Sequence, residues 1–493
     1  MPLIANLLSL RLPERYSRLE ISPQLQRQKT LAALLAWLLA LGERQPLVLL
    51  AEDLHWTDPS TLQWLGLVIE QCPTANVLLL CTFRPEFEPP WPVRGHLLQI
   101  ALSRLRRQEA KDLIAGAIAS EVLPDALVDE IAARSDGVPL FVEELAHGLI
   151  ESGHDLASSL SGLAIPETLH DSLMARLDRL GDAKQVAQLG AAVGRTFPYA
   201  LLEAVAPITD LALREGLERL VEAELVYRRG LPPNATYVFK HALVQDAAYQ
   251  SLLASQCREL HGRIADALEQ RFPEQIAREP EVAAHHCEQA GRTLPAIAHY
   301  LRAGERATQR FAHAEAVDQL QKALELVRTL PEGAERDRQE LEIEVALGPS
   351  LSVARAFTDP AVEAVYGRAL ELCQAVGECP ELLRALMGLS LFHYGRGRLV
   401  IAAELAERAL ALAERTGTGF LLLGAHARLG INLYRQGELT RARAHLAQAV
   451  DLYDPVGHRS RVSVWGGGTG ASLPGSISLG LSGRSDTRTR LSA

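Results

Sequence analysis

Residues 47–59 have the sequence LVLLAEDLHWTDP, a short apolar run that ends in two acids, Glu52 and Asp53. A run of this length with polar residues at its carboxyl end is typical of a buried strand in a parallel sheet. A helix is expected over residues 60–72, and a second apolar run follows at 77–82. Strand, helix and strand at this spacing predict a βαβ unit.

The two acids after the first strand form the arrangement called Walker B. A carboxylate there can hold a hydrated Mg²⁺ beside the phosphates of a nucleotide, and a neighbouring acid can orient water. Arg84 follows the second strand, where a cation can face a terminal phosphate. The alternatives stay open: apolar strands that end in acids are common, and Arg84 can instead pair with Glu86 or Glu88 at the surface.

The rest of the chain has mainly helical patterns. Helices are expected over 22–44, before the first strand, and over 107–119, 125–134 and 140–151, after the second. A stretch containing Gly and Ser, residues 152–164, separates these helices from the next segment.

Residues 167–253 combine amphipathic helices with a predicted hairpin. Its strands are 225–228 and 236–239, and its loop is 230–234. Helices that end in a hairpin are the outline of a winged-helix domain.

The four-residue string ALEL, or a close variant of it, recurs in the C-terminal half. It occurs at 323–326, 369–372, 409–412 and 449–452, at offsets of 46, 40 and 40 residues. In the last two copies Tyr394, Gly397, Leu399 and Ala402 match Tyr434, Gly437, Leu439 and Ala442. A period near 40 with glycine between two helical segments indicates a tetratricopeptide-like α-solenoid, which is expected to bind a protein or peptide partner. The alternative is chance similarity among Ala/Leu-rich helices.

Composition excludes several classes of protein. The 493 residues carry 50 Lys and Arg against 60 Asp and Glu, which argues against a protein that coats nucleic acid. Six cysteines without a CxxC pair make neither a disulfide framework nor a zinc site, and adjacent residues in His285-His286-Cys287 point in different directions on a helix. The longest apolar run, 31–41, has about half of the roughly 20 residues of a membrane span. No secretory signal is apparent, so we expect a soluble, cytoplasmic protein without membrane association.

Five segments together resemble the STAND ATPases. They are EDLHWTDPSTLQWL from residue 52, TFRPEF from 82, DGVPLFVEELAHGLIESG from 136, IPETLHDSLMARLDRL from 165 and YVFKHALVQDAAYQSLL from 237. More narrowly, roughly residues 15–460 are similar to the predicted ATPase and repeat portion of bacterial multidomain regulators. In those proteins this portion often follows an adenylate/guanylate cyclase or protein-kinase domain, or precedes a DNA-binding domain.

The resemblance implies ATP or ADP with Mg²⁺ as ligands. Carried over by position, Glu52 is the Mg²⁺-linked acid, Asp53 is the second acid with a catalytic role, and Arg84 is the sensor arginine, also with a catalytic role.

Three further positions match the family pattern for cofactor binding. Gly137 and Pro139 match its GxP turn, whose proline packs near the adenine, and His241 matches a winged-helix histidine that reaches a bound diphosphate. The alternatives are an ordinary turn that opens the helix 140–151 and a structural histidine after a strand.

The family pattern also needs a Walker A loop, GxxxxGK[ST], and none occurs here, since none of the five lysines follows a glycine. The loop gives backbone N–H groups and a lysine to the phosphates. Losing two or three such bonds, at roughly 1.5–3 kcal/mol each, is expected to weaken binding at least about 100-fold. We therefore expect no ATP hydrolysis by this chain alone, and expect it to be the C-terminal part of a longer regulator, or a reading frame begun inside one.

The predicted domains are listed in chain order. They are a partial nucleotide-binding α/β domain (1–100), a helical lid (101–164), a winged-helix-like domain (165–255), an α-solenoid (256–460) and a disordered tail (461–493) with seven Gly and seven Ser. The tail has no helical period, and we expect a frameshift or premature end near Arg461.

Three functions remain open. The first is a regulatory, signal-transducing ATPase-family protein, catalytically incomplete, whose repeats sense a partner and pass that state to an output domain such as a cyclase or kinase. The second is a nucleotide-independent scaffold that binds partners through its repeats. The third is a winged-helix transcription regulator. DNA binding is disfavoured because the helix that would enter the groove, 213–224, carries four glutamates, which would repel phosphates.

Overall fold

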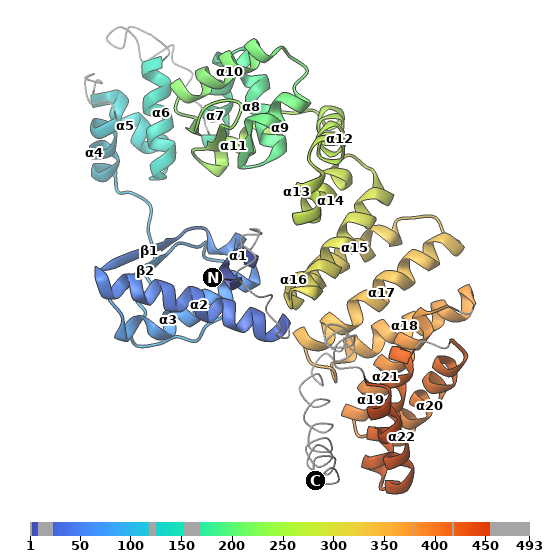
Figure 1. The fold of residues 1–493 in the computed structure, drawn as a ribbon. Helices are drawn as coiled ribbons and strands as arrows, with labels where there is room; N and C mark the ends of the chain where they lie inside the picture. The colour runs from blue at the N-terminus through green and yellow to red at the C-terminus, as the bar shows by residue number, and fades with distance from the viewer. Residues whose placement is uncertain are drawn as a thin grey trace. The chain divides into compact units, whose positions relative to one another are not determined.

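The computed structural model describes residues 2–7, 23–117, 125–151, 168–377, 379–416 and 419–453. These residues are mainly helical, with five short strands in two small sheets, which confirms the expected fold class (Figure 1). The chain divides into two compact units, here called the first unit (Met1–His96 with Thr293–Ala493) and the second unit (Leu97–Arg292). The predicted stretch 152–164 and the predicted tail 461–493 lie outside the described residues, and the predicted domain boundaries stay predictions.

The N-terminal part of the first unit contains the predicted βαβ arrangement. After α1 (Pro2–Leu7) and α2 (Pro23–Arg44), the strands β1 (Leu47–Ala51) and β2 (Val77–Cys81) flank α3 (Pro59–Gln71). The strands are parallel, with Leu47 opposite Val77 and Ala51 opposite Cys81. Helix α3 begins one residue before the predicted start at 60, because the Asp58 side chain accepts a hydrogen bond from Thr61 N–H and Pro59 is the first helical residue.

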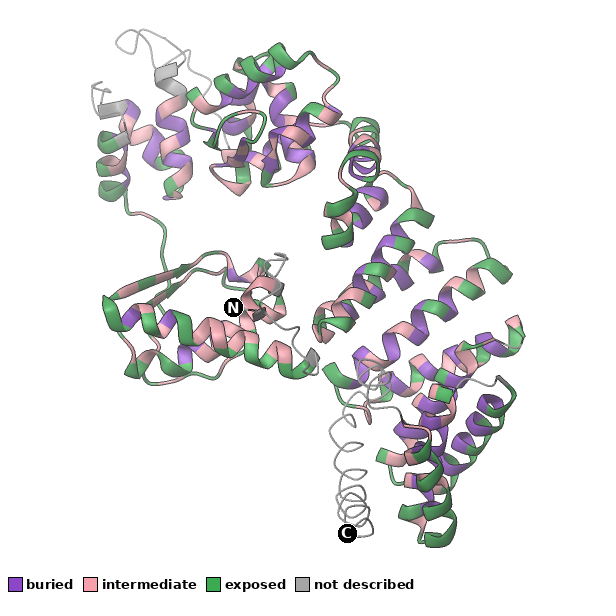
Figure 2. Cartoon of the chain, viewed as in Figure 1, coloured by how far each residue is buried: buried purple, intermediate pink, exposed green. Residues whose placement is uncertain are grey.

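The two-stranded sheet is covered on one face only. Leu47, Leu49 and Leu79 pack towards α2 and α3. On the opposite face Val48, Leu50, Leu78 and Leu80 are 47–60% exposed, and no described helix covers them (Figure 2). The prediction of a buried strand over the first apolar run is therefore wrong for one of its faces, because the strands alternate between a packed and an open face.

The second unit begins with the three predicted lid helices. They are α4 (Arg107–Ala117), α5 (Asp125–Arg134) and α6 (Pro139–Glu151). One fully buried residue from each helix, Ile114, Ile131 and Val142, contributes to their common core.

The predicted hairpin follows within a separate core. It consists of β4 (Val226–Arg229) and β5 (Thr236–Phe239), and a short strand that was not expected, β3 (Thr196–Pro198), pairs with β5 to give the order β3-β5-β4. Phe197 on β3 is fully buried and stacks on Tyr237 of β5. A strand of three residues is too short to show the alternation of apolar and polar residues by which a strand is predicted from sequence.

Six helices precede, separate or follow these strands along the chain. In order they are α7 (Leu169–Arg179), α8 (Asp182–Val193), α9 (Tyr199–Val205), α10 (Asp210–Glu222), α11 (Ala242–Gln250) and α12 (Ala254–Arg271). Helix α12 packs into the same core through Ile264 and Leu268. We call α7–α12 with their sheet the hairpin domain; α13 (Pro273–Arg278) and α14 (Pro280–Gln289) complete the second unit.

The remainder of the first unit is a series of antiparallel helix pairs. These are α15 (Thr293–Gln309), α16 (His313–Arg328), α17 (Ala334–Ala354), α18 (Pro360–Val376), α19 (Glu381–Gly395), α20 (Leu399–Thr416), α21 (Gly419–Gln436) and α22 (Leu439–Asp451). The repeated string falls in the second helix of each pair, and its first alanine is at most 1% exposed in all four copies. Gly397 and Gly437, 40 residues apart, turn the chain with φ of 73° and 87°. The predicted solenoid is confirmed in these residues.

Within the described ranges, no helix combines the length and the apolar character needed to cross a bilayer.

Candidate functional site

The predicted acids and the predicted arginine lie at the same edge of the β1–β2 sheet. Glu52 and Asp53 follow β1 directly, and Arg84 follows β2 by three residues. Because the strands are parallel, their carboxyl ends meet at one edge. Glu52 and Arg84 are exposed there and Asp53 is half-buried, so the edge is open to a ligand.

The turn after β1 is held to the end of β2 by its backbone. The Asp53 N–H donates to Thr82 Oγ1 (3.0 Å) and the Leu54 N–H donates to the Thr82 carbonyl oxygen (2.9 Å). Asp53 adopts a left-handed conformation, with φ 56° and ψ 47°. Such conformations cost roughly 1–3 kcal/mol in a non-glycine residue and concentrate at functional sites. The two hydrogen bonds to Thr82 hold this conformation and so fix the position of the two acids.

Arg84 is placed by an aromatic ring that the sequence analysis did not single out. Its guanidinium carbon lies 5.4 Å from the centre of the Trp56 ring, a cation–π distance. Among the described residues, Arg84 forms no ion pair with Glu86 or Glu88, so the surface pairing considered for it is not seen. The signal for Trp56 was present, since an exposed tryptophan directly follows the acidic motif.

The donors at this edge fit a hard cation. Mg²⁺ prefers carboxylate and water oxygens and usually takes only one or two protein carboxylates. Glu52 and Asp53 supply two such groups at an accessible position. The phosphate cradle of a Walker A loop has no counterpart in the sequence, so the fit extends to the cation and not to the phosphates.

The predicted GxP turn lies in the second unit, where Gly137 has a structural role. Gly137 is buried with φ 69°, and a Cβ built there would lie 2.3 Å from the Leu105 carbonyl oxygen. The Leu105 N–H donates to the Gly137 carbonyl oxygen (2.8 Å). Pro139 is exposed and begins α6. The turn therefore needs glycine for packing, and the roles of Gly137 and Pro139 towards adenine stay predictions.

His241 lies at the start of α11, in the same unit. It is half-buried and its side chain makes no capping hydrogen bond. Burial lowers the pKa of His241, and Lys240 lowers it further, while Glu144 and Glu143 on α6 oppose this change. A neutral imidazole is thus favoured, and its role towards a diphosphate stays a prediction.

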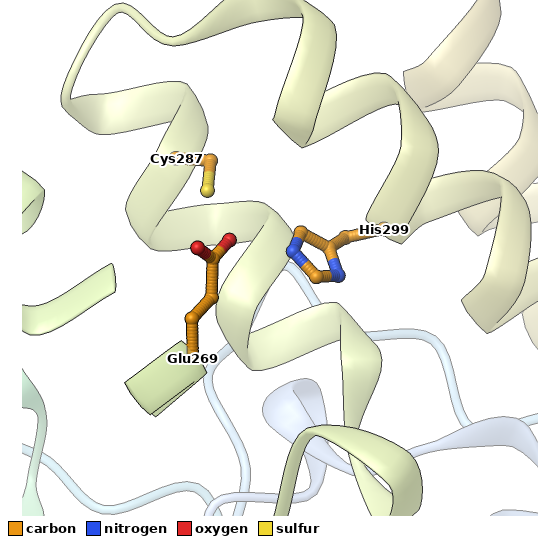
Figure 3. A group of neighbouring side chains, drawn as sticks. All are labelled: Glu269, Cys287 and His299. Atoms are coloured by element: carbon orange, nitrogen blue, oxygen red, sulfur yellow. The ribbon is translucent and has the colours of Figure 1, made fainter. Parts of the chain in front are cut away.

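The cluster around residues 285–287 is a packed histidine group. His286 Nδ1 lies 2.8 Å from His261 Nδ1, and Tyr249 hydroxyl lies 2.9 Å from His261 Nε2. Figure 3 shows Glu269 on α12 near Cys287 on α14; the third labelled residue, His299, belongs to the first unit. Burial raises the pKa of Cys287 to about 11, and Glu269 adds to this. A thiol held protonated is a poor metal ligand.

No family model matches the chain. An uncharacterized protein of Rhizobium meliloti (strain 1021) is 30% identical over 382 residues, which is 76% of this chain; the chain spans 37% of that relative's length.

Two solved structures are also similar. One is a Signal Transduction ATPase with Numerous Domains (STAND) protein with a tetratricopeptide repeat sensor from Pyrococcus horikoshii, with 12% identity, a TM-score of 0.35, and 82% of this chain and 68% of that chain covered. The other is BtubC (BKLC) from P. vanneervenii, with 15% identity, a TM-score of 0.27, and coverage of 58% and 94%. With TM-scores this low, the fold rests on the chain's own helices and strands.

Proposed function

We propose that the chain is a regulatory, signal-transducing protein of the STAND type, in which an ATP-linked sheet edge and a partner-binding solenoid are parts of one switch. Mg²⁺ with ATP or ADP binds weakly at Glu52, Asp53 and Arg84, and the chain alone does not hydrolyse ATP. The observation that carries the proposal is the convergence of two acids and one arginine at the carboxyl edge of parallel strands. Ligands of α/β sheets bind outside the carboxyl ends of the strands.

Each residue at the edge has a proposed task. Glu52 and Asp53 hold hydrated Mg²⁺, which neutralises charge on the phosphates when the nucleotide is bound. Arg84, steadied by the Trp56 ring, faces the terminal phosphate. The roles of the GxP turn and of His241 towards a nucleotide, which the resemblance implies, stay predictions.

The solenoid supplies the proposed sensor. Four consecutive helix pairs form the surface that such repeats use to bind proteins or peptides. An output domain such as a cyclase or kinase, carried by a longer relative, would receive the signal.

A second candidate is a scaffold whose repeats bind partners without nucleotide. The absence of GxxxxGK[ST] from the sequence favours it. DNA binding has less support, because the helix α10 exposes Glu215, Glu218 and Glu222.

Titration of the chain with a fluorescent ATP analogue tests the proposal. We expect Mg²⁺-dependent binding below millimolar concentration, lost in the Glu52→Ala/Asp53→Ala variant and kept in Glu86→Ala/Glu88→Ala, which removes two exposed acids after β2. No binding up to millimolar concentration, or equal binding by both variants, would contradict the nucleotide site and leave the scaffold.

A further inference from the structure

Two free cysteines are in contact where one helix pair of the solenoid meets the next. Cys373 lies in the last turn of α18, directly after the repeated string at 369–372, and Cys379 lies shortly before α19 begins at Glu381. The Sγ atoms of the two cysteines are 3.1 Å apart. The S–S bond of a disulfide is about 2.05 Å long, so the sulfur atoms need to approach by only about 1 Å to form one.

Backbone hydrogen bonds hold each cysteine at the end of a helix. Gly377 ends α18, and its N–H donates to the Cys373 carbonyl oxygen (3.0 Å). The Leu382 N–H, at the start of α19, donates to the Cys379 carbonyl oxygen (3.3 Å). The folded chain therefore keeps the two thiols close together before any bond forms between them.

The two thiols differ in their exposure. Cys373 is 3% exposed and belongs to a core with Leu341 and Val345 from α17 and Ala385 from α19, whereas Cys379 is half-buried and packs against that core. Burial raises the pKa of the Cys373 thiol, and Cys379 raises it further. Because a buried, protonated thiol reacts slowly, the more exposed Cys379 reacts with an oxidant first.

We propose that Cys373 and Cys379 are a redox-sensitive pair, which hydrogen peroxide converts into a disulfide across the junction between the helix pairs α17–α18 and α19–α20. The Cys379 sulfur attacks one peroxide oxygen, the O–O bond breaks, and the products are a sulfenic acid at Cys379 and one water. The Cys373 sulfur then attacks the Cys379 sulfur, the S–O bond breaks, and the hydroxyl leaves with the Cys373 proton as a second water. Two molecules of a thiol such as glutathione reverse the reaction by exchange.

The disulfide limits the motion of one junction in the solenoid. Residues 373–379 become a closed loop, which restricts how far the end of α18 and the start of α19 can separate. Since each repeat of a solenoid contacts only its neighbours, oxidation stiffens the array at this junction. This inference goes beyond the proposed function and depends neither on nucleotide nor on the identity of a partner.

Peptide mass spectrometry tests for the bond. The full chain is treated with hydrogen peroxide, its remaining thiols are blocked with N-ethylmaleimide under denaturing conditions, and trypsin then releases residues 369–384, ALELCQAVGECPELLR, as one peptide with both cysteines. We expect this peptide to carry no N-ethylmaleimide and to be two hydrogen atoms lighter than its reduced form, and glutathione should restore both thiols. The control is Cys257→Ser, which removes a half-buried thiol from α12 and should give the same result.

Two single variants test the order of the steps. In Cys373→Ser the sulfenic acid at Cys379 has no second thiol to react with, so it should persist and be trapped by dimedone. In Cys379→Ser the buried Cys373 should stay a free thiol. Dimedone on Cys373 in the second variant, with none on Cys379 in the first, would contradict the assigned order.

Equilibration with glutathione shows whether the fold brings the thiols together. The pair in the folded chain should stay half oxidised in a glutathione buffer at least about tenfold more reducing than the buffer that does so for the chain unfolded in urea, a difference of about 30 mV. Hydrogen–deuterium exchange in residues 369–384 should also slow when the folded chain is oxidised.

The proposal is overturned if peroxide leaves both thiols of this peptide free, if Cys379 becomes a sulfinic acid without forming the disulfide, or if the folded and unfolded chains have the same equilibrium with glutathione. Unchanged hydrogen exchange in the oxidised chain would contradict the stiffening. None of these results bears on Mg²⁺-dependent nucleotide binding at Glu52 and Asp53, so failure here is distinct from failure of the proposed switch.

Discussion

Glu144 on α6 and Arg176 on α7 form a buried ion pair in which Nη1 of the arginine lies 2.9 Å from both carboxylate oxygens. Nη2 of Arg176 also donates to the carbonyl oxygen of Ala223, 2.6 Å away, at the end of α10. One guanidinium thus joins the last lid helix to two helices of the hairpin domain. We expect this contact to hold the lid and hairpin domain together.

Removing one partner of this pair should destabilise the second unit strongly. Glu144→Ala leaves the Arg176 charge buried, so the second unit should lose about 3–5 kcal/mol of stability. Urea unfolding followed by circular dichroism measures the change. The control is Glu130→Ala, which removes an i,i+4 pair with Arg134 (2.8 Å) at the surface and should cost about 0.3–0.5 kcal/mol. Equal effects of the two substitutions would contradict the assignment.

The turn at Gly137 gives a prediction that is independent of nucleotide. Gly137→Ala should destabilise the second unit more than Gly181→Ala does. Both positions have positive φ and each should cost roughly 1–3 kcal/mol for backbone strain. Only at Gly137 does the new Cβ also meet the backbone of Leu105, whereas nothing lies within 4 Å at Gly181. Urea midpoints of the two variants check this, and a smaller loss at Gly137 would refute the packing role.

Two glycines flanking Tyr366 make room for its ring. Gly388→Ala should destabilise the solenoid, and Tyr366→Leu should partly restore stability in the double variant. Gly367→Ala, in α18 beside Tyr366, has nothing within 4 Å of the new Cβ and should stabilise by about 0.5–1 kcal/mol. Opposite signs in thermal unfolding are the expected outcome; destabilisation by Gly367→Ala and not by Gly388→Ala would contradict it.

The histidine group predicts a pH dependence. Burial lowers the pKa of His261 from 6.5 to about 4 and that of His286 to about 3. Between pH 6.5 and these lowered pKa values, the unfolded chain binds more protons than the folded chain. The neutral histidines therefore contribute fully to the free energy of unfolding above pH 6.5, and this contribution is lost as the pH falls below 6.5.

Comparing variants separates the contribution of these histidines to the pH dependence of stability from the contribution of the Asp and Glu side chains. Urea midpoints measured from pH 7.5 to pH 5 should fall less steeply for His286→Leu than for the unmodified chain. The exposed His170 on α7 serves as control, and His170→Leu should leave the slope unchanged. A slope that is the same in His286→Leu would show that the buried pair does not titrate as described.

Much of the fold could be predicted because it depends on local patterns. The apolar runs indicated β1 and β2, and the helix expected over 60–72 is α3, which begins at Pro59. The 40-residue period gave the helix pairs. The short strand β3 could not be predicted because it exists only through pairing with β5, far along the chain. The open face of the sheet was also missed, since an apolar run does not show which side is covered.

The acids and the arginine of the candidate site could be predicted from the sequence, but the contacts that position them could not. Glu52 and Asp53 carry their chemistry in their residue types, and parallel pairing places them beside Arg84. The left-handed turn at Asp53 and the contact between Arg84 and Trp56 depend on tertiary packing.

Hydrogen–deuterium exchange of the full chain, with and without Mg²⁺ and ATP, tests the central claim most directly. We expect slower exchange in residues 51–58 and 82–84 when both ligands are present, and no such change in Glu52→Ala/Asp53→Ala. Unchanged exchange in these residues at millimolar ATP, or the same protection in the variant, would contradict a nucleotide site at the edge of this sheet.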